Sequence, residues 1–475
     1  LFYIMEGGTS SMQASVLNMV INCMGVGVLS SAWCFSRSSI VVGVLLAVVC
    51  SMLSVVSFVA LAQACEATQK FTYLEVGKQL LGKRGGLGIQ VTVFLHTFLS
   101  TIAYVVFFAD LMPQGLSHLF DNISLNIELG KDFSVLVVSI AAVVLFTPLS
   151  LLRTLEMLKY TSFLAGFAFV FIIFVVVFQL ATQKSSHVKA CNTGFPQVDT
   201  LKYSPCLLDA FPVIAMAFCA HFNGPDYYKE LKNRSVRRFG IVSFSSLTIV
   251  LAAFLLIGTT GYMTCGNEVE QVLLNSYNQG NNLVIAAELL FGIVVAFTLP
   301  FIMFQCKVSF FAIFMPSIDP NSWKGRAITT IILAVSVVVG IILKKKVTVV
   351  IGFIGCITGS CIVFIFPALL ALNIPQLSKK GSAVNTSVPS AASDLLNTPS
   401  STSSARGLFP SFDSPSSSFN KPLLAGSAQV GTPEQSIEHT RSRPQDSHRV
   451  CRCGQENVHA WILLVFGLVL SVVGL

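Results

Sequence analysis

The sequence predicts an all-α protein that crosses a membrane eleven times. Apolar residues make up 53% of its 475 residues, and its mean hydropathy is +0.75. Only 11% of the residues are charged, whereas soluble domains carry about 25%. Apolar runs of about 20 residues, each long enough to cross the hydrocarbon of a bilayer, recur along nearly the whole length. Runs such as Val135 to Phe146 are continuous, whereas the strands of a membrane β-barrel alternate.

Short polar loops separate the eleven expected spans. The spans cover residues 11–35, 39–64, 88–114, 133–151, 157–181, 204–227, 238–262, 282–306, 326–343, 347–374 and 457–475. Lys and Arg are more frequent in loops on the side of the N-terminus than on the opposite side, which predicts a cytosolic N-terminus. These loop residues explain the net charge of +8, and no recognition module indicates a nucleic-acid partner. The chain begins at Leu1 without a cleavable signal pattern, so we expect the natural N-terminus to lie upstream.

Composition divides the chain into three parts. Residues 1–375 hold ten of the expected spans, and residues 457–475 hold the eleventh. Between them, residues 376–456 are rich in Ser, Thr and Pro and poor in aromatic residues. Such a composition buries too little apolar surface to offset the entropy of ordering. We therefore expect residues 376–456 to form a disordered cytosolic loop, which serves as a linker or binds regulators.

Two of the expected spans are interrupted by polar and helix-breaking residues, and each begins a block of about five helices. The interrupting residues are Asn22, Gly25 and Gly27 within Asn18 to Ser31, and His221, Asn223, Gly224 and Pro225 within Met216 to Lys229. Paired interruptions at matching places in two halves are typical of secondary transporters, whose binding site lies at the break. Gly25 and Gly27 could instead serve close helix packing.

The interrupted helices predict where a substrate binds. Breaks at Gly25 and Gly27 would expose backbone amides at the start of a half-helix, where the helix dipole favours an anion such as a carboxylate. Irregular backbone at membrane depth is tolerated where it is buried or lines a cavity. The predicted substrate-binding residues are Asn22, Gly25, Val26, Gly27, Val28, His221 and Asn223.

Several motifs in order along the chain resemble one family. The run Leu17 to Leu29 resembles the first-helix signature of the amino acid/auxin permease family, which includes sodium-coupled neutral and vacuolar amino acid transporters. Further matches are Thr72 to Lys78, Asp110 to Pro113, Pro148 to Arg153, Cys219 to Asn223, Thr298 to Pro300, and Gly352 to Gly359 with Pro367. The matches cover about residues 11–372. Lys307 departs from the pattern, because many relatives have Arg there.

The resemblance implies two inverted five-helix repeats plus one extra helix, in the LeuT-like arrangement of the APC superfamily, working by alternating access. It implies secondary active transport of free amino acids, with the α-amino and α-carboxyl groups held at Asn22, Gly25, Val26 and Gly27. In sodium-coupled members a first-helix Asn and an eighth-helix Thr contribute to a cation site, which Asn22 and Thr298 match. Proton coupling would instead require a titratable group.

The coupling ion therefore stays open between Na⁺ and H⁺, and no further cofactor is expected. Neutral oxygen donors such as Asn22 and Thr298 suit a hard cation. The titratable residues available within spans are Glu288, His96, His221 and Asp209. Intramembrane groups of this kind are candidates for function, but Glu288 and Asp209 lie near the non-cytosolic ends of their helices, where water reaches them, and need no functional role. A different reading is an amino acid sensor that signals through residues 376–456 with little flux. No nucleophile, metal spacing or phosphate loop indicates an enzyme.

Two covalent features are predicted on the non-cytosolic side. Cys191 and Cys206 flank the loop between the fifth and sixth spans, in an oxidising compartment where a disulfide is expected. Asn122 begins a glycosylation sequon. We expect a monomer in the plasma membrane or in a vacuolar or lysosomal membrane.

Overall fold

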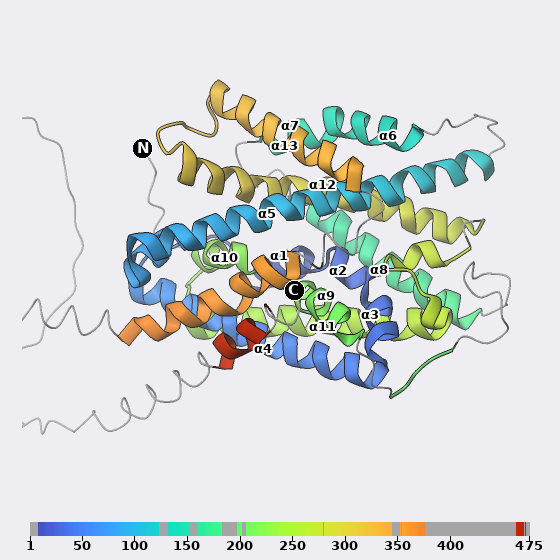
Figure 1. The fold of residues 1–475 in the computed structure, drawn as a ribbon, viewed down its shortest axis with the longest axis horizontal. Coiled ribbons are helices and arrows are strands. Elements are labelled where there is room, and N and C mark those ends of the chain that lie inside the picture. Colours follow the sequence, from blue (N-terminus) through green and yellow to red (C-terminus); the bar gives the residue numbers. More distant parts are fainter. Residues whose placement is uncertain are drawn as a thin grey trace, which may run out of the picture. The chain divides into compact units, whose positions relative to one another are not determined.

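Nine helices in the described part of the chain are long and apolar enough to cross a membrane (Figure 1). The computed structural model describes residues 8–122, 132–152, 159–182, 197–201, 206–278, 280–343, 352, 354–375, 462–469 and 471. The candidate spans are Ile40–Thr68, Tyr73–Asp121, Phe133–Ser150, Leu164–Ala181, Leu207–Glu230, Val236–Glu268, Asn282–Phe314, Trp323–Leu343 and Ile354–Pro375. Each overlaps one expected span.

Two expected spans are missing from this set for different reasons. The span at 11–35 is broken into three helices, each too short to cross a bilayer alone. The span at 457–475 is described only at 462–469 and 471. The predicted loop at 376–456 also lies outside the described residues. The number of eleven spans, the inverted relation between the two halves and the limits of the loop therefore stay predictions.

The described elements of the first half follow the expected order. They are α1 (Met12–Cys23), α2 (Val26–Leu29), α3 (Ser31–Ser38), α4 (Ile40–Thr68), α5 (Tyr73–Asn122), α6 (Phe133–Ala141), the π-helix η1 (Ala142–Phe146), α7 (Thr147–Ser150) and α8 (Lys159–Ala181). The side chain of Ser11 caps α1 by accepting a hydrogen bond from the Ala14 amide at 3.2 Å. Gly82, with a φ of 79°, divides α5 into two helical parts.

The second half begins with the second interrupted segment. Its elements are α9 (Leu207–Ala217), the 3₁₀ turn η3 (His221–Asn223), α10 (Gly224–Glu230), α11 (Val236–Cys265), η4 (Gly266–Glu268), η5 (Leu273–Ser276), α12 (Asn282–Phe314), α13 (Trp323–Leu343) and the π-helices η6 (Ile354–Gly359) and η7 (Cys361–Ile365). Ser235 caps α11, and Asn281 caps α12. Polar side chains thus supply hydrogen bonds that helix ends would otherwise lack.

The helices are apolar on their outer faces as well as their inner ones. Val143, Val170 and Ile342 are 73%, 67% and 73% exposed. In α4 the mean hydropathy of the most apolar window is 2.7, although only 44% of that window is buried inside the protein. A helix that is apolar all round and still exposed is stable when lipid covers it.

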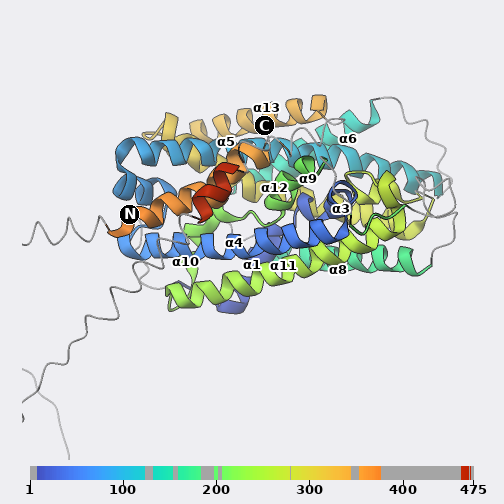
Figure 2. The same cartoon turned by 60° about the horizontal axis from the view of Figure 1, so that its bottom comes forward.

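The core forms between two groups of helices. The helices α5 and α12 pack along each other, while α11 packs against α1, α3 and α4 (Figures 1 and 2). The first residues of the described chain join the second half, because Ser10 and Leu231 form an isolated parallel bridge. In this bridge the Ser10 amide donates to the Glu230 carbonyl at 2.9 Å, and the Lys232 amide donates to the Ser10 carbonyl at 2.9 Å.

Candidate functional site

One pocket lies where both interrupted segments meet α5. Its lining comes from α1, α2 and the break between them, from α5, from α9 and the segment after it, and from single residues of α12 and η6. The lining residues are Asn22, Cys23, Gly25, Gly27, His96, Ser100, Ala103, Tyr104, Met216, Cys219, Phe222, Ile302 and Ile354. None of these described residues is Asp, Glu, Lys or Arg.

The first break lies where the sequence predicts it. The helix α1 ends at Cys23, Met24 and Gly25 are not helical, and α2 begins at Val26. A Cβ atom on Gly25 would stand 2.5 Å from the Tyr104 hydroxyl oxygen, and a Cβ atom on Gly27 would stand 3.0 Å from the Ala217 Cα atom. Both glycines therefore permit close approach, one to a pocket side chain and one to the backbone of α9.

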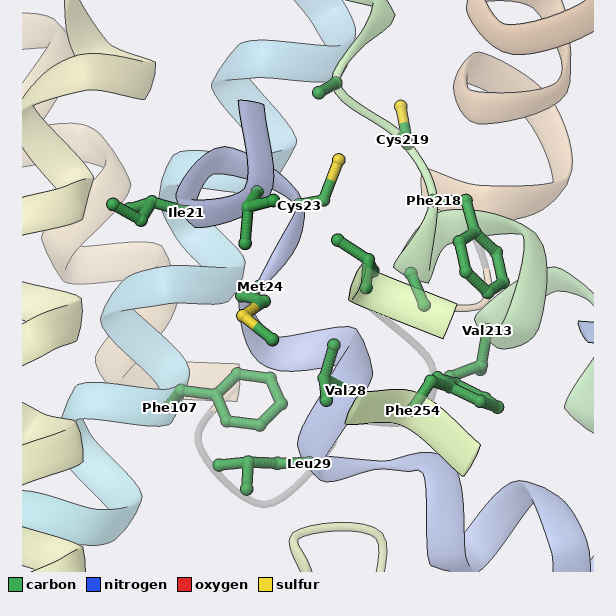
Figure 3. Packing of buried hydrophobic residues seen from close by; sticks show 14 of the residues in the cluster. Ile21, Cys23, Met24, Val28, Leu29, Phe107, Val213, Phe218, Cys219 and Phe254 are labelled. Carbon is green, nitrogen blue, oxygen red and sulfur yellow. The ribbon is translucent and has the colours of Figure 1, made fainter. Parts of the chain in front are cut away.

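Apolar packing holds this break in place. Val28 and Leu29 are fully buried, and Met24 is 8% exposed. Figure 3 shows these three side chains near Phe107 of α5, and Cys23 near Cys219 of the second interrupted segment. The Met24 amide still donates to the Val20 carbonyl and the Gly25 amide to the Cys23 carbonyl, both at 2.7 Å, so these hydrogen bonds and van der Waals packing together hold the break.

The second break differs from its predicted position by a few residues. The helix α9 ends at Ala217, residues 219–220 are irregular, and η3 follows. Gly224 and Pro225 begin α10 instead of interrupting a helix. Proline is well placed at a helix start because the amide it lacks would have no partner in the helix. Cys219 and Phe222 of this break line the pocket.

Hydrogen bonds join the two interrupted segments. The Asn22 amide nitrogen Nδ2 donates to the Tyr227 hydroxyl at 2.5 Å. The side chain of Asn223 also forms a hydrogen bond with Tyr227. Asn22 and Asn223, both predicted for the site, thus share a hydrogen-bond partner, Tyr227, which was not predicted. Tyr227 lies four residues after Asn223, one helical turn away, and this spacing was the available signal.

His96 is a titratable side chain of the pocket whose ring orientation is fixed by contacts at both nitrogens. It is 1% exposed, and its Nδ1 lies 3.0 Å from the Thr358 hydroxyl oxygen. The Thr358 hydroxyl donates to the Ile354 carbonyl at 2.9 Å, so its oxygen accepts a hydrogen bond from Nδ1–H of His96. The neutral ring then carries its lone pair on Nε2, which lies 3.8 Å from the Cys219 sulfur.

Other predicted residues lie outside the pocket lining. The His221 ring stacks on Phe58 with centroids 3.8 Å apart, and its Nε2 donates to the Ser54 carbonyl at 3.2 Å. The Thr298 hydroxyl donates to the Val294 carbonyl at 2.7 Å, one helical turn from the lining residue Ile302. Glu288 is fully buried in α12, and Asp209 is exposed. A substrate-contact role for His221 and a cation role for Thr298 stay predictions.

The remaining lining residues were not predicted individually. Ser100, Ala103 and Tyr104 follow His96 at spacings of four to eight residues, which places them along one face of α5. The sequence showed this periodicity. The periodicity alone does not indicate which face of α5 packs against the two breaks.

The predicted covalent features lie mainly outside the described residues. Cys191 is outside them, whereas Cys206 is half-buried and precedes α9 as its N-cap residue. Asn122 is the last residue of α5, and the other two sequon residues lie outside the described part. The disulfide and the glycosylation site therefore stay predictions.

Comparison with known families gives one match over most of the chain. A family model described as transmembrane amino acid transporter protein matches residues 8–396.

Among solved structures, the chain is similar to a manganese transporter from Eremococcus coleocola. The crystal structure of that transporter in complex with an aromatic bis-isothiourea substituted compound gives a TM-score of 0.45 at 11% sequence identity, over 98% of this chain and 95% of that one. A mutant of the same transporter gives a TM-score of 0.46 at 11% identity, over 99% of both chains. Similarity at this level does not indicate what the present chain carries.

Proposed function

Because this chain belongs to the transmembrane amino acid transporter protein family, an integral membrane family of transporters, we propose that it carries free amino acids by secondary active transport. In this proposal the substrate binds in the pocket between the two interrupted segments. Its α-amino and α-carboxyl groups form hydrogen bonds with peptide groups of residues 22–28, and its side chain faces α5, α12 and η6.

The observation that supports this proposal most directly is that both breaks line one pocket without charged side chains. Asn22, Gly25 and Gly27 come from the first segment, and Cys219 and Phe222 come from the second. Peptide N–H and C=O groups released from a helix can pair with a carboxylate and an ammonium group. A lining without Asp, Glu, Lys or Arg fits a substrate whose two charges cancel, since an unpaired charge would be costly there.

Competition by blocked analogues tests this proposal. We expect unlabelled L-alanine, L-leucine or L-glutamine to displace the labelled form of at least one of these three from purified protein. The methyl ester and the N-acetyl derivative of the bound amino acid should compete at least roughly ten-fold less well, a loss of about 1.4 kcal/mol, because each removes one of the two charged groups. Equal competition by both derivatives and the free amino acid would show that the α groups are not recognised.

Sodium coupling through Asn22 and Thr298 is the alternative for the driving ion. The ring of Pro300 in α12 lacks an N–H, so the Ala296 carbonyl loses its helical donor near Thr298. A Na⁺ site there would use neutral oxygens. Under this alternative, Thr298→Ala should weaken Na⁺ activation of uptake by roughly ten-fold, about 1.4 kcal/mol, and Thr298→Ser should be milder. Uptake that is equal in sodium and choline buffers would eliminate the alternative.

A further inference from the structure

The pocket contains an imidazole, that of His96, and each of its two ring nitrogens has one neighbour, the Thr358 hydroxyl or the Cys219 thiol. Thr358 directs its own proton to Ile354, so Nδ1 of His96 must be the donor of the 3.0 Å contact. Nε2 is then the proton acceptor of the neutral ring, on the side of Cys219. His96 belongs to α5 and Thr358 to η6, so this hydrogen bond also joins the long helix to the ninth candidate span, Ile354–Pro375.

The groups that face His96 leave its charge uncompensated when no substrate is bound. The thiol of Cys219 faces Nε2, with Cys23 of α1 beside that thiol, and the imidazole of His221 in η3 lies close enough to interact electrostatically with His96. From α12, Cys306 contacts Thr97, the residue after His96, and η6 presents the Thr358 hydroxyl. Tyr104 lies two turns further along α5. These groups are thiols, hydroxyls, a phenol and an imidazole. In their neutral forms none of them carries a negative charge that could pair with an imidazolium at His96.

We propose that His96 binds the coupling proton on Nε2, and that the proton and the carboxylate of an amino acid occupy the pocket together. This inference rests on the proposed transport function. A proton from the compartment of higher proton activity adds to the Nε2 lone pair, and the imidazolium keeps its Nδ1–H bond to Thr358. A lone imidazolium in this uncharged pocket is disfavoured, whereas beside a bound amino acid its charge faces the substrate carboxylate while peptide groups of the first break hold the ammonium group. The imidazolium and the carboxylate attract each other, which links the two binding events as symport requires.

The direct test compares the parent protein with His96→Gln. Glutamine retains an N–H donor for the Thr358 hydroxyl but does not titrate. In the parent, binding of L-alanine, L-leucine or L-glutamine should be accompanied by uptake of up to one proton from a weakly buffered solution. The affinity should fall as the pH rises, by at most ten-fold per unit. In His96→Gln, proton uptake should vanish and the affinity should become independent of pH, while the amino acid still binds.

Transport in vesicles gives a second readout. Because a proton carried with a net-neutral amino acid moves one positive charge, the membrane potential is held at zero, and a gradient of one pH unit then supports at most about ten-fold accumulation by a one-to-one symporter. The parent should approach this accumulation, whereas His96→Gln should exchange labelled for unlabelled amino acid without accumulating it. His118→Gln is the matched control, since His118 lies on the same helix α5 but outside the lining, and it should keep the proton uptake.

A positioning test does not depend on His96→Gln folding correctly. Thr358→Val removes the acceptor of Nδ1–H, and a hydrogen bond to the charged form favours that form. The pH dependence of binding should therefore move to lower pH in Thr358→Val, and Thr358→Ser should restore it.

The outcomes separate this inference from the proposed function. Amino acid binding by the parent without proton uptake would overturn the role of His96 and leave the proposed function intact. Proton-driven accumulation that persists in His96→Gln would also overturn it. A parent that binds none of the three amino acids at any pH would overturn both.

Discussion

Gly27→Ala should reduce amino acid affinity by between ten- and hundred-fold while leaving the protein folded. The added Cβ would stand 3.0 Å from the Cα and 3.2 Å from the backbone nitrogen of Ala217. These are backbone atoms, so they cannot rotate away, and overpacking of this kind costs about 1–3 kcal/mol. The strain falls where the two interrupted segments meet, so α2 and α9 must shift apart by a few tenths of an ångström beside the pocket. Equilibrium binding of labelled L-alanine, L-leucine or L-glutamine measures the loss.

Gly166→Ala is the matched control for this substitution. Gly166 lies in α8, and no atom lies within 4 Å of the Cβ that alanine would add. It should bind with parental affinity and elute at the parental volume in size-exclusion chromatography. If Gly27→Ala also binds with parental affinity, the close approach of the two breaks does not shape the binding site.

Lys307→Met should destabilise the protein by about 3 kcal/mol, because hydrogen bonds from charged groups are worth about 1.5–3 kcal/mol each and two are lost. Lys307 is 2% exposed, and its Nζ donates to the Ser150 carbonyl at 3.0 Å and to the Leu152 carbonyl at 3.2 Å. These carbonyls lie at and just beyond the end of α7, where helical donors are missing. Thermal unfolding in detergent should show the midpoint falling by roughly 5 °C.

Lys324→Met gives the comparison, since Lys324 is exposed at the start of α13 and a surface substitution changes stability by about 0.5 kcal/mol or less. Lys307→Arg keeps donors for the two carbonyls and should recover much of the stability. Equal midpoints for Lys307→Met and Lys324→Met would show that the two hydrogen bonds contribute nothing to stability.

Hydropathy and helix-breaking residues were enough to predict the helices and the first break. Nine expected spans have counterparts because continuous apolar runs have few alternatives to a membrane helix. Gly25 indicated the first break correctly, and a Cβ there would require the Tyr104 hydroxyl to shift. Pro225 was misleading, because a proline can begin a helix as readily as it ends one.

The side chains that complete the site were harder to predict, because their positions depend on tertiary packing. His96 and His221 are both buried histidines within apolar sequence. One lines the pocket and the other stacks on Phe58. The difference depends on which face of α5 and η3 meets which neighbour, and hydropathy carries no information about that rotation. Tyr227 escaped notice for the same reason, since its partner Asn22 is distant in sequence.

The two connections between the start of the chain and α10 have a mechanical consequence. Ser10 is bonded to the backbone at Glu230 and Lys232, and Asn22 is bonded to Tyr227, so both ends of α1 are tied to the α10 region. Neither α1 nor α10 can separate from the other without breaking the hydrogen bonds at Ser10 and at Asn22. A displacement of α1 must therefore carry α10 with it or break the hydrogen bonds at both ends of α1. The first and second interrupted segments, which both line the pocket, are thus coupled by hydrogen bonds that lie outside its lining at Ser10 and Tyr227.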